Sequence, residues 1–421
     1  MENSKTLNYI KKVLENMPTD WLNLTTHRLD IYDEKLAKYQ FLEQFEILYN
    51  NNNYDAATLK ELPTAFDYIR LGHPLSCVLE WVIAKQYNTK HESVISFSSQ
   101  TAPVLAVLRK NLLDNVNTQI VYTNELPECF DFETLKTIYN YKFDLKSVDD
   151  RKDIPDFNGS TIYISQQDNI CDFNLSSNVD FHININPNFG SILLVNNVES
   201  ENYISEIQHV RRRETIAMTP ANTLSVLQLL LNQSINFNNS DIDSDKTSVI
   251  SSIQKVTDVN TKPLIASSGL SIQYAILMGL VHDAVEKHKG KAIKIVVPPN
   301  CYGGTNDQAR RVAACLDNVD VVDLPVDGGN DMVKSIDTVL TKIANEDAIP
   351  YIIAEIPTNP RVEVPNLIKL ENVLSQTRKT ATGNTAIAPV FILDQTFCPN
   401  VHFLGDNEIL STVSTISFAS G

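Results

Sequence analysis

Apolar runs of strand length alternate with helical patterns in the last third of the chain. The runs cover residues 293–297, 351–354, 390–393 and 412–418. Segments with apolar residues at helical spacing, among them 308–316 and 331–344, separate these runs. Unbroken apolar strands are typical of parallel strands that are buried on both faces. The pattern from residue 263 onward therefore predicts an α/β fold with a mostly parallel, doubly wound sheet.

The first part of the chain has a less regular pattern. Residues 1–60 read as helices, and residues 75–85 have apolar positions at helical spacing. Between residues 91 and 233, short apolar runs alternate with helical or polar stretches, which predicts a second α/β segment. These runs cover residues 94–97, 120–122, 161–164 and 192–195.

Polar composition marks two further segments. Residues 234–262 are rich in Asn, Ser and Asp, which predicts a linker or a surface hairpin. The consecutive arginines Arg211, Arg212 and Arg213 predict a solvated helix face. We accordingly divide the chain into an N-terminal helical arm, an inserted α/β unit with a polar linker, and a partial large domain. Their predicted bounds are residues 1–90, 91–262 and 263–421.

Charge and composition narrow the class of protein. The 421 residues carry a formal net charge of −16, which argues against a nucleic-acid partner or an anionic membrane surface. The six cysteines form no C-x-x-C pair and the eight histidines form no H-x-x-x-H pair, so we expect no metal site. No apolar window is long enough to span a bilayer, and the N-terminus lacks an apolar signal core. We expect a soluble, cytoplasmic protein.

Each apolar run in the last third leads into a polar motif. Tyr302 follows the first run, Asn359 the second and Asp394 the third, and Ser420 follows the fourth. In open parallel sheets, ligands bind beyond the carboxyl ends of the strands. The convergence of these motifs at strand ends predicts one ligand site.

The chemistry of these positions suits one flat, phosphorylated ring. Asp394 directly follows a buried strand, where a carboxylate is costly unless it meets a cation such as a protonated pyridine nitrogen. Tyr302 could stack on a ring and Asn359 could donate to a ring oxygen. A helix that starts at Ser268 and Gly269 could bind a phosphate, although these residues could equally serve only as a helix cap. A phosphate, a flat ring, a hydroxyl and a pyridine nitrogen describe pyridoxal 5′-phosphate.

Five ordered motifs resemble those of the Cys/Met-metabolism family of pyridoxal-phosphate enzymes, which contains cystathionine γ-synthase, cystathionine lyases and methionine γ-lyase. The family patterns are Y-x-R-x-G-N-P, S-S-G-M, Y-G-G-T, S-P-T-N-P and D-N-T-F. The matching segments are residues 68–74, 267–270, 302–305, 356–360 and 394–397. The resemblance covers a little under half of the chain. It implies the large domain of the fold-type-I transferases.

The resemblance implies a role for each matched residue. Gly269 and Leu270 would offer backbone N–H groups to the phosphate. Tyr302 would stack on the ring, Asn359 would contact the ring hydroxyl, and Asp394 would pair with the pyridinium.

Further roles concern the support of the ring and the neighbouring subunit. Thr396 would support the ring from below, and Ser420 would bind the phosphate. Tyr68 and Arg70 would reach the phosphate of a neighbouring subunit, which implies a homodimer or homotetramer. A guanidinium such as that of Arg70 grips phosphate bidentately.

The chain departs from the family pattern in several places. His73 and Gln395 stand where the family has Asn, and Leu270 stands where it has Met. The distance from Arg70 to Gly269 is 269 − 70 = 199 residues, far longer than in the family. A second serine-rich turn at residues 96–101 lies at the usual distance but lacks the glycine. We therefore assign the phosphate turn to Ser268 and Gly269, and we interpret the intervening part as an insertion.

The Schiff-base lysine of the family has no counterpart, since no lysine follows Asp394. We expect the chain to be an inactive N-terminal portion of a longer enzyme, and we assign no catalytic residue. The resemblance implies trans-sulfuration chemistry, by C–S lyase or γ-synthase type elimination or replacement on a sulfur-containing or O-acylated amino acid. Two alternatives stay open. They are another fold-type-I enzyme such as an aminotransferase, and a non-catalytic scaffold or partner subunit.

Overall fold

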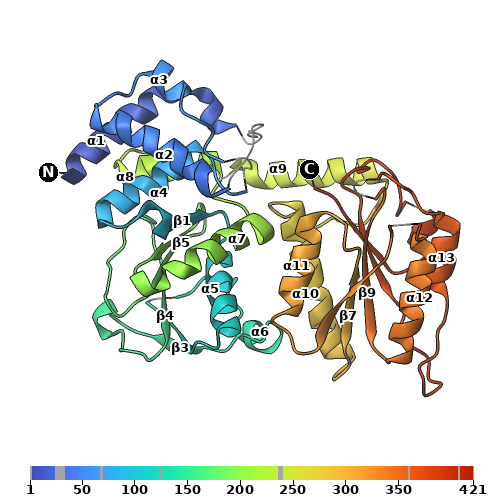
Figure 1. The fold of residues 1–421 in the computed structure, drawn as a ribbon. Helices are drawn as coiled ribbons and strands as arrows, with labels where there is room; N and C mark the ends of the chain where they lie inside the picture. The colour runs from blue at the N-terminus through green and yellow to red at the C-terminus, as the bar shows by residue number, and fades with distance from the viewer. Residues whose placement is uncertain are drawn as a thin grey trace. The chain divides into compact units, whose positions relative to one another are not determined.

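The computed structural model divides the chain into two compact units (Figure 1). The first contains residues 1–136 and 141–237, and the second contains residues 137–140 and 238–421. The predicted boundary after residue 90 thus lies inside the first unit. The structure describes residues 2–23, 34–66, 70–123, 125–235, 240–327, 329–358, 361–405 and 408–420.

The second unit is built on a parallel sheet of five strands, four of which the apolar runs predict. The strands are β7 (Ile293–Val297), β8 (Val319–Asp323), β9 (Ile349–Glu355), β10 (Val390–Asp394) and β11 (Thr415–Phe418). Their order in the sheet is β11-β10-β9-β7-β8, and every neighbouring pair is parallel. The last strand begins at residue 415 rather than 412, because residues 409–412 form a 3₁₀ helix.

Helices cover both faces of this sheet (Figure 1). They are α10 (Gly269–Lys287), α11 (Gly303–Ala313), α12 (Met332–Asn345) and α13 (Leu367–Ser375). The chain passes from β7 through α11 to β8 on one side, and then through α12 to β9 on the other side of β7. Because such crossovers are right-handed, α11 and α12 must lie on opposite faces. The sheet is therefore doubly wound, and the predicted fold class is confirmed.

The first unit contains a mixed sheet of six strands. They are β1 (Val94–Phe97), β2 (Thr118–Tyr122), β3 (Asp144–Ser147), β4 (Ser160–Gln166), β5 (Phe181–Asn186) and β6 (Gly190–Val195). Their order is β1-β6-β5-β4-β2-β3, and only β6 runs antiparallel to its neighbours. All four apolar runs predicted in this region are strands.

Helices pack around the first sheet. They are α1 (Glu2–Asn16), α2 (Glu34–Asn50), α3 (Ala56–Lys60), α4 (Pro74–Tyr87), α5 (Ala102–Leu113), α6 (Phe132–Thr137), α7 (Ile204–Glu214) and α8 (Pro220–Leu230). Of these, α1, α2 and α4 form a helical layer beside the sheet. Short 3₁₀ helices of this unit cover Thr19–Leu22, His91–Ser93, Arg151–Asp153 and Val198–Tyr203. Aromatic side chains of α1, α2 and α4 share one core, where Trp81 packs edge-on against Phe45 and Tyr49.

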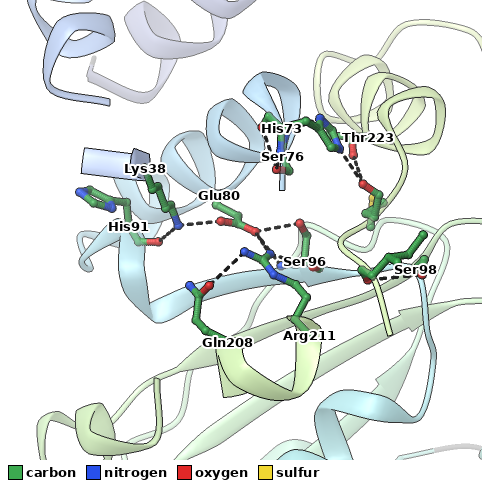
Figure 2. Close-up of polar contacts among 12 residues, drawn as sticks. Lys38, His73, Ser76, Glu80, His91, Ser96, Ser98, Gln208, Arg211 and Thr223 are labelled. Carbon is green, nitrogen blue, oxygen red and sulfur yellow. Dashed lines mark hydrogen bonds and ion pairs between the residues drawn. The ribbon is translucent and has the colours of Figure 1, made fainter. Parts of the chain in front are cut away.

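A buried group of charges holds this helical layer to the sheet (Figure 2). Glu80 on α4 accepts hydrogen bonds from Lys38 Nζ at 2.6 Å, Arg211 Nη1 at 2.7 Å and Ser96 N at 2.9 Å. Burial alone would raise the pKa of Glu80, but the two cations outweigh it and lower the pKa to about 2. The interpretation of Arg211 as part of a solvated face is wrong, because its side chain is fully buried against this carboxylate.

His73 caps the first turn of α4 in the same region (Figure 2). Its Nδ1 accepts a hydrogen bond from Ser76 N, while Ser76 Oγ accepts one from His73 N, which completes a capping box. Its Nε2 lies 2.7 Å from the carbonyl oxygen of Met218. Pro74 occupies the first helical position, where its fixed φ and missing N–H carry no cost.

Of the two structures predicted for residues 234–262, a linker or a surface hairpin, the hairpin is wrong, because Ser240–Thr257 forms helix α9. The serine and threonine hydroxyls bond to carbonyls four residues earlier, for example Thr247 Oγ1 to Asp243 O, which a helix allows. Within the residues that the structure describes, no helix combines the length and apolar character needed to cross a bilayer.

Candidate functional site

The carboxyl edge of the second sheet gathers several of the predicted site residues. Asp394 is the last residue of β10 and pairs in register with Glu355 on β9 and Phe418 on β11. Ser420 follows two residues after Phe418. Parallel pairing therefore brings these strand ends to one place, as the apolar runs predict.

A continuous chain of hydrogen bonds joins Asp394 to Ser420. Asp394 Oδ1 accepts from Thr396 Oγ1 at 2.6 Å and from Thr396 N at 3.0 Å. Ser420 N in turn donates to Thr396 Oγ1 at 3.0 Å. Thr396 thus fixes the position of the loop after β11 relative to the carboxylate that ends β10.

The start of α10 lies directly against Ser420. A Cβ atom added at Gly269 would stand 2.7 Å from Ser420 Cβ, which is closer than real Cβ atoms approach. Only glycine lets the first turn of α10 come this near. The N–H groups at the start of α10 therefore lie beside Ser420, which is itself bonded through Thr396 to Asp394.

We expect Gly269→Ala to loosen this contact. The added methyl overpacks the turn, so local opening of α10 and β11 should become easier by roughly 1–3 kcal/mol. Hydrogen exchange of the peptides that cover residues 269–287 and 415–420 measures this opening. The control is Gly279→Ala in the same helix, where an added Cβ meets nothing within 4 Å and should slow exchange. Equal exchange in both variants would contradict the close approach.

Asp394 is buried, with only 7% of its surface exposed. Burial raises its pKa, although the two hydrogen bonds from Thr396 act in the opposite direction. Among the described residues, Oδ2 has no hydrogen-bond partner. A buried carboxylate with one unbound oxygen can accept a charged donor at this point.

Glu355 is a site residue that the sequence analysis missed. It ends β9, is 6% exposed, and accepts a hydrogen bond from Tyr302 N at 2.7 Å. This bond holds the turn at which α11 begins, and the Tyr302 side chain is 38% exposed. Glu355 directly follows the apolar run 351–354, which is the same signal that identified Asp394.

Two cysteine thiols lie at the same edge. Burial, followed by the charges of Glu355 and Asp394, raises the pKa of Cys301 to about 12. Burial and the Asp394 charge also raise the pKa of Cys398, whose Sγ lies 2.7 Å from the carbonyl oxygen of Ile356. Both thiols are therefore poor nucleophiles at neutral pH.

The remaining predicted residues differ in their placement. Ser268 Oγ accepts from Ser271 N at 3.1 Å, so its side chain acts as the helix cap, and Leu270 is buried in the first turn of α10. Arg70 is buried in the first unit, where its carbonyl accepts from Ala217 N. Asn359 and Tyr68 lie outside the described residues.

No family model and no curated protein sequence matches the chain. Similar solved structures include metB from Corynebacterium glutamicum, at 12% identity over 62% of this chain and 71% of that chain, with a TM-score of 0.32. Cystathionine gamma-lyase from yeast is 11% identical over 59% and 68%, with a TM-score of 0.33. The Lactobacillus plantarum cystathionine gamma-lyase complexed with L-serine is 10% identical over 63% and 75%, with a TM-score of 0.31. Overlaps with TM-scores this low establish no function, which has to be argued from the site residues.

Proposed function

We propose that the carboxyl edge of the second unit binds pyridoxal 5′-phosphate, and that the chain serves sulfur amino-acid metabolism. The observation that carries this proposal is the hydrogen-bond chain from Ser420 through Thr396 to Asp394, together with the approach of Gly269 to Ser420. These four residues come from three separate segments of the sequence, 267–270, 394–397 and the end of the last apolar run, and they lie together at the carboxyl ends of the strands.

The phosphate end fits the residues present. The first turn of α10 supplies N–H groups and a positive dipole end, and Gly269 leaves room above them. Ser268 orders this turn by capping it, and the Ser420 hydroxyl adds a donor beside it. A dianionic phosphate would therefore be bound by backbone N–H groups and a hydroxyl, and no buried cation is needed to hold it.

The ring end fits as well. Asp394 Oδ1 is engaged by Thr396, which leaves Oδ2 to accept a proton-bearing ring nitrogen. Tyr302, held at its backbone by Glu355, presents a partly exposed ring at the same edge. When bound, the cofactor would supply an electron sink for carbanions next to an amino group. The residues of this chain would bind it, orient it and keep its ring nitrogen protonated.

The substrate class rests on the five-motif resemblance described above. It supports a sulfur-containing or O-acylated amino acid and elimination or replacement at its side chain. From the same resemblance we propose a homodimer or homotetramer in which Tyr68 and Arg70 approach the phosphate of a neighbouring subunit. No lysine follows Lys379 in the sequence, and we assign no Schiff-base residue.

Binding of 4′-deoxypyridoxine 5′-phosphate tests the cofactor site. This analogue keeps the ring nitrogen and the phosphate but has no aldehyde, so it cannot react with surface lysines. We expect saturable binding with one site per chain by calorimetry. Asp394→Asn should weaken it by roughly 10- to 100-fold, because a charge-assisted hydrogen bond contributes about 1.5–3 kcal/mol. Absence of saturable binding by the wild-type chain would overturn the proposal.

A strand-terminal control separates the carboxylate from general effects of charge. Asp323→Asn at the end of the edge strand β8 removes the same charge away from the site and should leave the affinity unchanged. Because burial raises the pKa of Asp394, affinity should fall as the pH drops through that raised value in the wild type but not in Asp394→Asn. Equal affinities of Asp394→Asn and Asp323→Asn would remove Asp394 from the ring-nitrogen role.

A further inference from the structure

The first unit has its own topological switch point. The chain leaves β2 for its neighbour β3 on one side, whereas β4 lies on the other side of β2. All three strands are parallel, so their carboxyl ends share one edge. Ligands of open α/β sheets bind where neighbouring strands are connected in opposite directions. In this unit that place lies between the ends of β2 and β4.

A guanidinium occupies this place. Arg151 Nε donates to Tyr163 Oη at 2.9 Å, and Arg151 Nη2 donates to Gln167 Oε1 at 3.4 Å. The Arg151 guanidinium also lies over the Tyr163 ring, 5.1 Å from its centroid. Gln167 directly follows β4. Within the described part of the chain, Arg151 has no carboxylate partner and Nη1 has no acceptor.

The lack of a carboxylate is unusual for this chain, whose 51 acidic residues outnumber its 35 lysines and arginines. The carboxylate of the preceding residue, Asp150, accepts instead from Lys152 N at 3.0 Å and pairs with Lys152 Nζ. The hydrogen-bond partners of Arg151 are therefore a phenol and an amide, which hold the guanidinium in place without an ion pair to a carboxylate.

The hydrogen-bond directions make a second donor available. Tyr163 Oη accepts from Arg151 Nε and lies 2.8 Å from Thr123 Oγ1. When the phenol O–H donates a hydrogen bond to Thr123 Oγ1, the Thr123 hydroxyl hydrogen is left to donate to a ligand. Gln167 cannot turn to satisfy Arg151 differently, because its Nε2 is bound to the carbonyl oxygens of Asn169 and Asp172. Tyr163 itself is buried.

We propose that Arg151 and Thr123 form an oxyanion-binding site at the switch point of the first unit, for a small ligand with a phosphate or carboxylate group. The guanidinium supplies the charge through Nη1, and the threonine supplies a neutral donor beside it. This site is separate from the cofactor site of the second unit, because all of its residues belong to the first unit.

Protection of Arg151 from phenylglyoxal, mapped by mass spectrometry, tests the site residue by residue in the full chain. Inorganic phosphate or succinate should slow modification of Arg151 about fivefold at an anion concentration about four times its dissociation constant. Protection by phosphate alone identifies a phosphate ligand, and protection by succinate alone a carboxylate. Arg310, which pairs with Asp323, is the control and should react equally with and without anions. Equal reaction of Arg151 under all conditions would overturn the proposal.

The variant Gln167→Glu supplies the missing carboxylate from within the chain. It should abolish protection by either anion, because the new side chain neutralises Arg151 at the same point. Thr123→Val, which keeps the shape of the side chain, should weaken protection without removing the charge. Undiminished protection in Gln167→Glu would show that the anions act elsewhere. Binding of the pyridoxal analogue should be unaffected in both variants, so this proposal and the cofactor proposal fail independently.

Discussion

Glu80→Leu is expected to destabilise the first unit by roughly 3–5 kcal/mol, because it leaves two cations buried without their carboxylate. Lys38 and Arg211 have 7% and 0% of their side chains exposed, so water cannot replace the lost partner. Ser96 N also loses its acceptor. Both tryptophans of the chain, Trp21 and Trp81, belong to this unit, so urea unfolding followed by tryptophan fluorescence reports on it alone.

Two comparisons show whether the unpaired charge is the cause. Lys110→Gln removes a more exposed ion pair between Lys110 on α5 and Asp114, which follows the helix, and should change stability by no more than about 0.5 kcal/mol. The triple variant Lys38→Met, Glu80→Leu, Arg211→Met removes the whole charge group, and it should recover most of the lost stability. If the triple variant is as unstable as Glu80→Leu, packing rather than charge governs this region.

Local sequence patterns do not predict this buried charge group. Lys38, Glu80 and Arg211 are separated by 42 and 131 residues, and each alone looks like an ordinary surface residue of a helix. Local periodicity reports which face of a helix is apolar, but it does not report a charge that is buried against a distant partner. The three consecutive arginines therefore read as a solvated face, although one of them faces the core.

The strands that were predicted and those that were missed differ in how they are buried. Strands such as β7 and β9 lie inside a parallel sheet, so an unbroken apolar run identifies them. β8 is an edge strand in which Asp320 pairs with Lys294, and aspartates interrupt its apolar residues. β5 is fully buried, yet apolar and polar residues alternate along its sequence. Asn184 on β5 donates to the carbonyl oxygens of Ile170 and Asp172, and such long-range compensation is invisible to a local pattern.

The candidate cofactor site was more accessible to sequence reasoning for a physical reason. Residues that end parallel strands meet at one edge whatever the loops between them do, so Asp394 and Ser420 could be placed from their strands alone. Arg151 could not, because it lies in a short 3₁₀ helix outside the strands. Its position depends on Tyr163 and Gln167, which no spacing rule connects to it.

The first unit is also expected to lose stability steeply in mild acid. Burial, the first cause in each case, lowers the pKa of His73, His91 and His182 from 6.5 to about 4. Between pH 6.5 and about pH 4, the three histidines are therefore protonated in the unfolded chain but neutral in the folded unit. Each histidine adds about 1.36 kcal/mol per pH unit in this window, so three give a slope on the order of 4 kcal/mol per unit. Stability is full above pH 6.5 and falls as the pH decreases.

The hydrogen bonds of His73 explain why its ring stays neutral in the folded state. Its Nδ1 accepts from Ser76 N, so a proton on this nitrogen would face another donor inside the core. His73→Asn keeps an acceptor at the cap and cannot titrate, so it should reduce the pH slope by about one third. Urea midpoints at pH 7, 6 and 5, read from tryptophan fluorescence, measure the slope, and His288→Gln in the second unit is the control. A midpoint that does not change between pH 7 and 5 would contradict the lowered pKa values, because folding is independent of pH only when the rings bind protons equally in the folded and unfolded states.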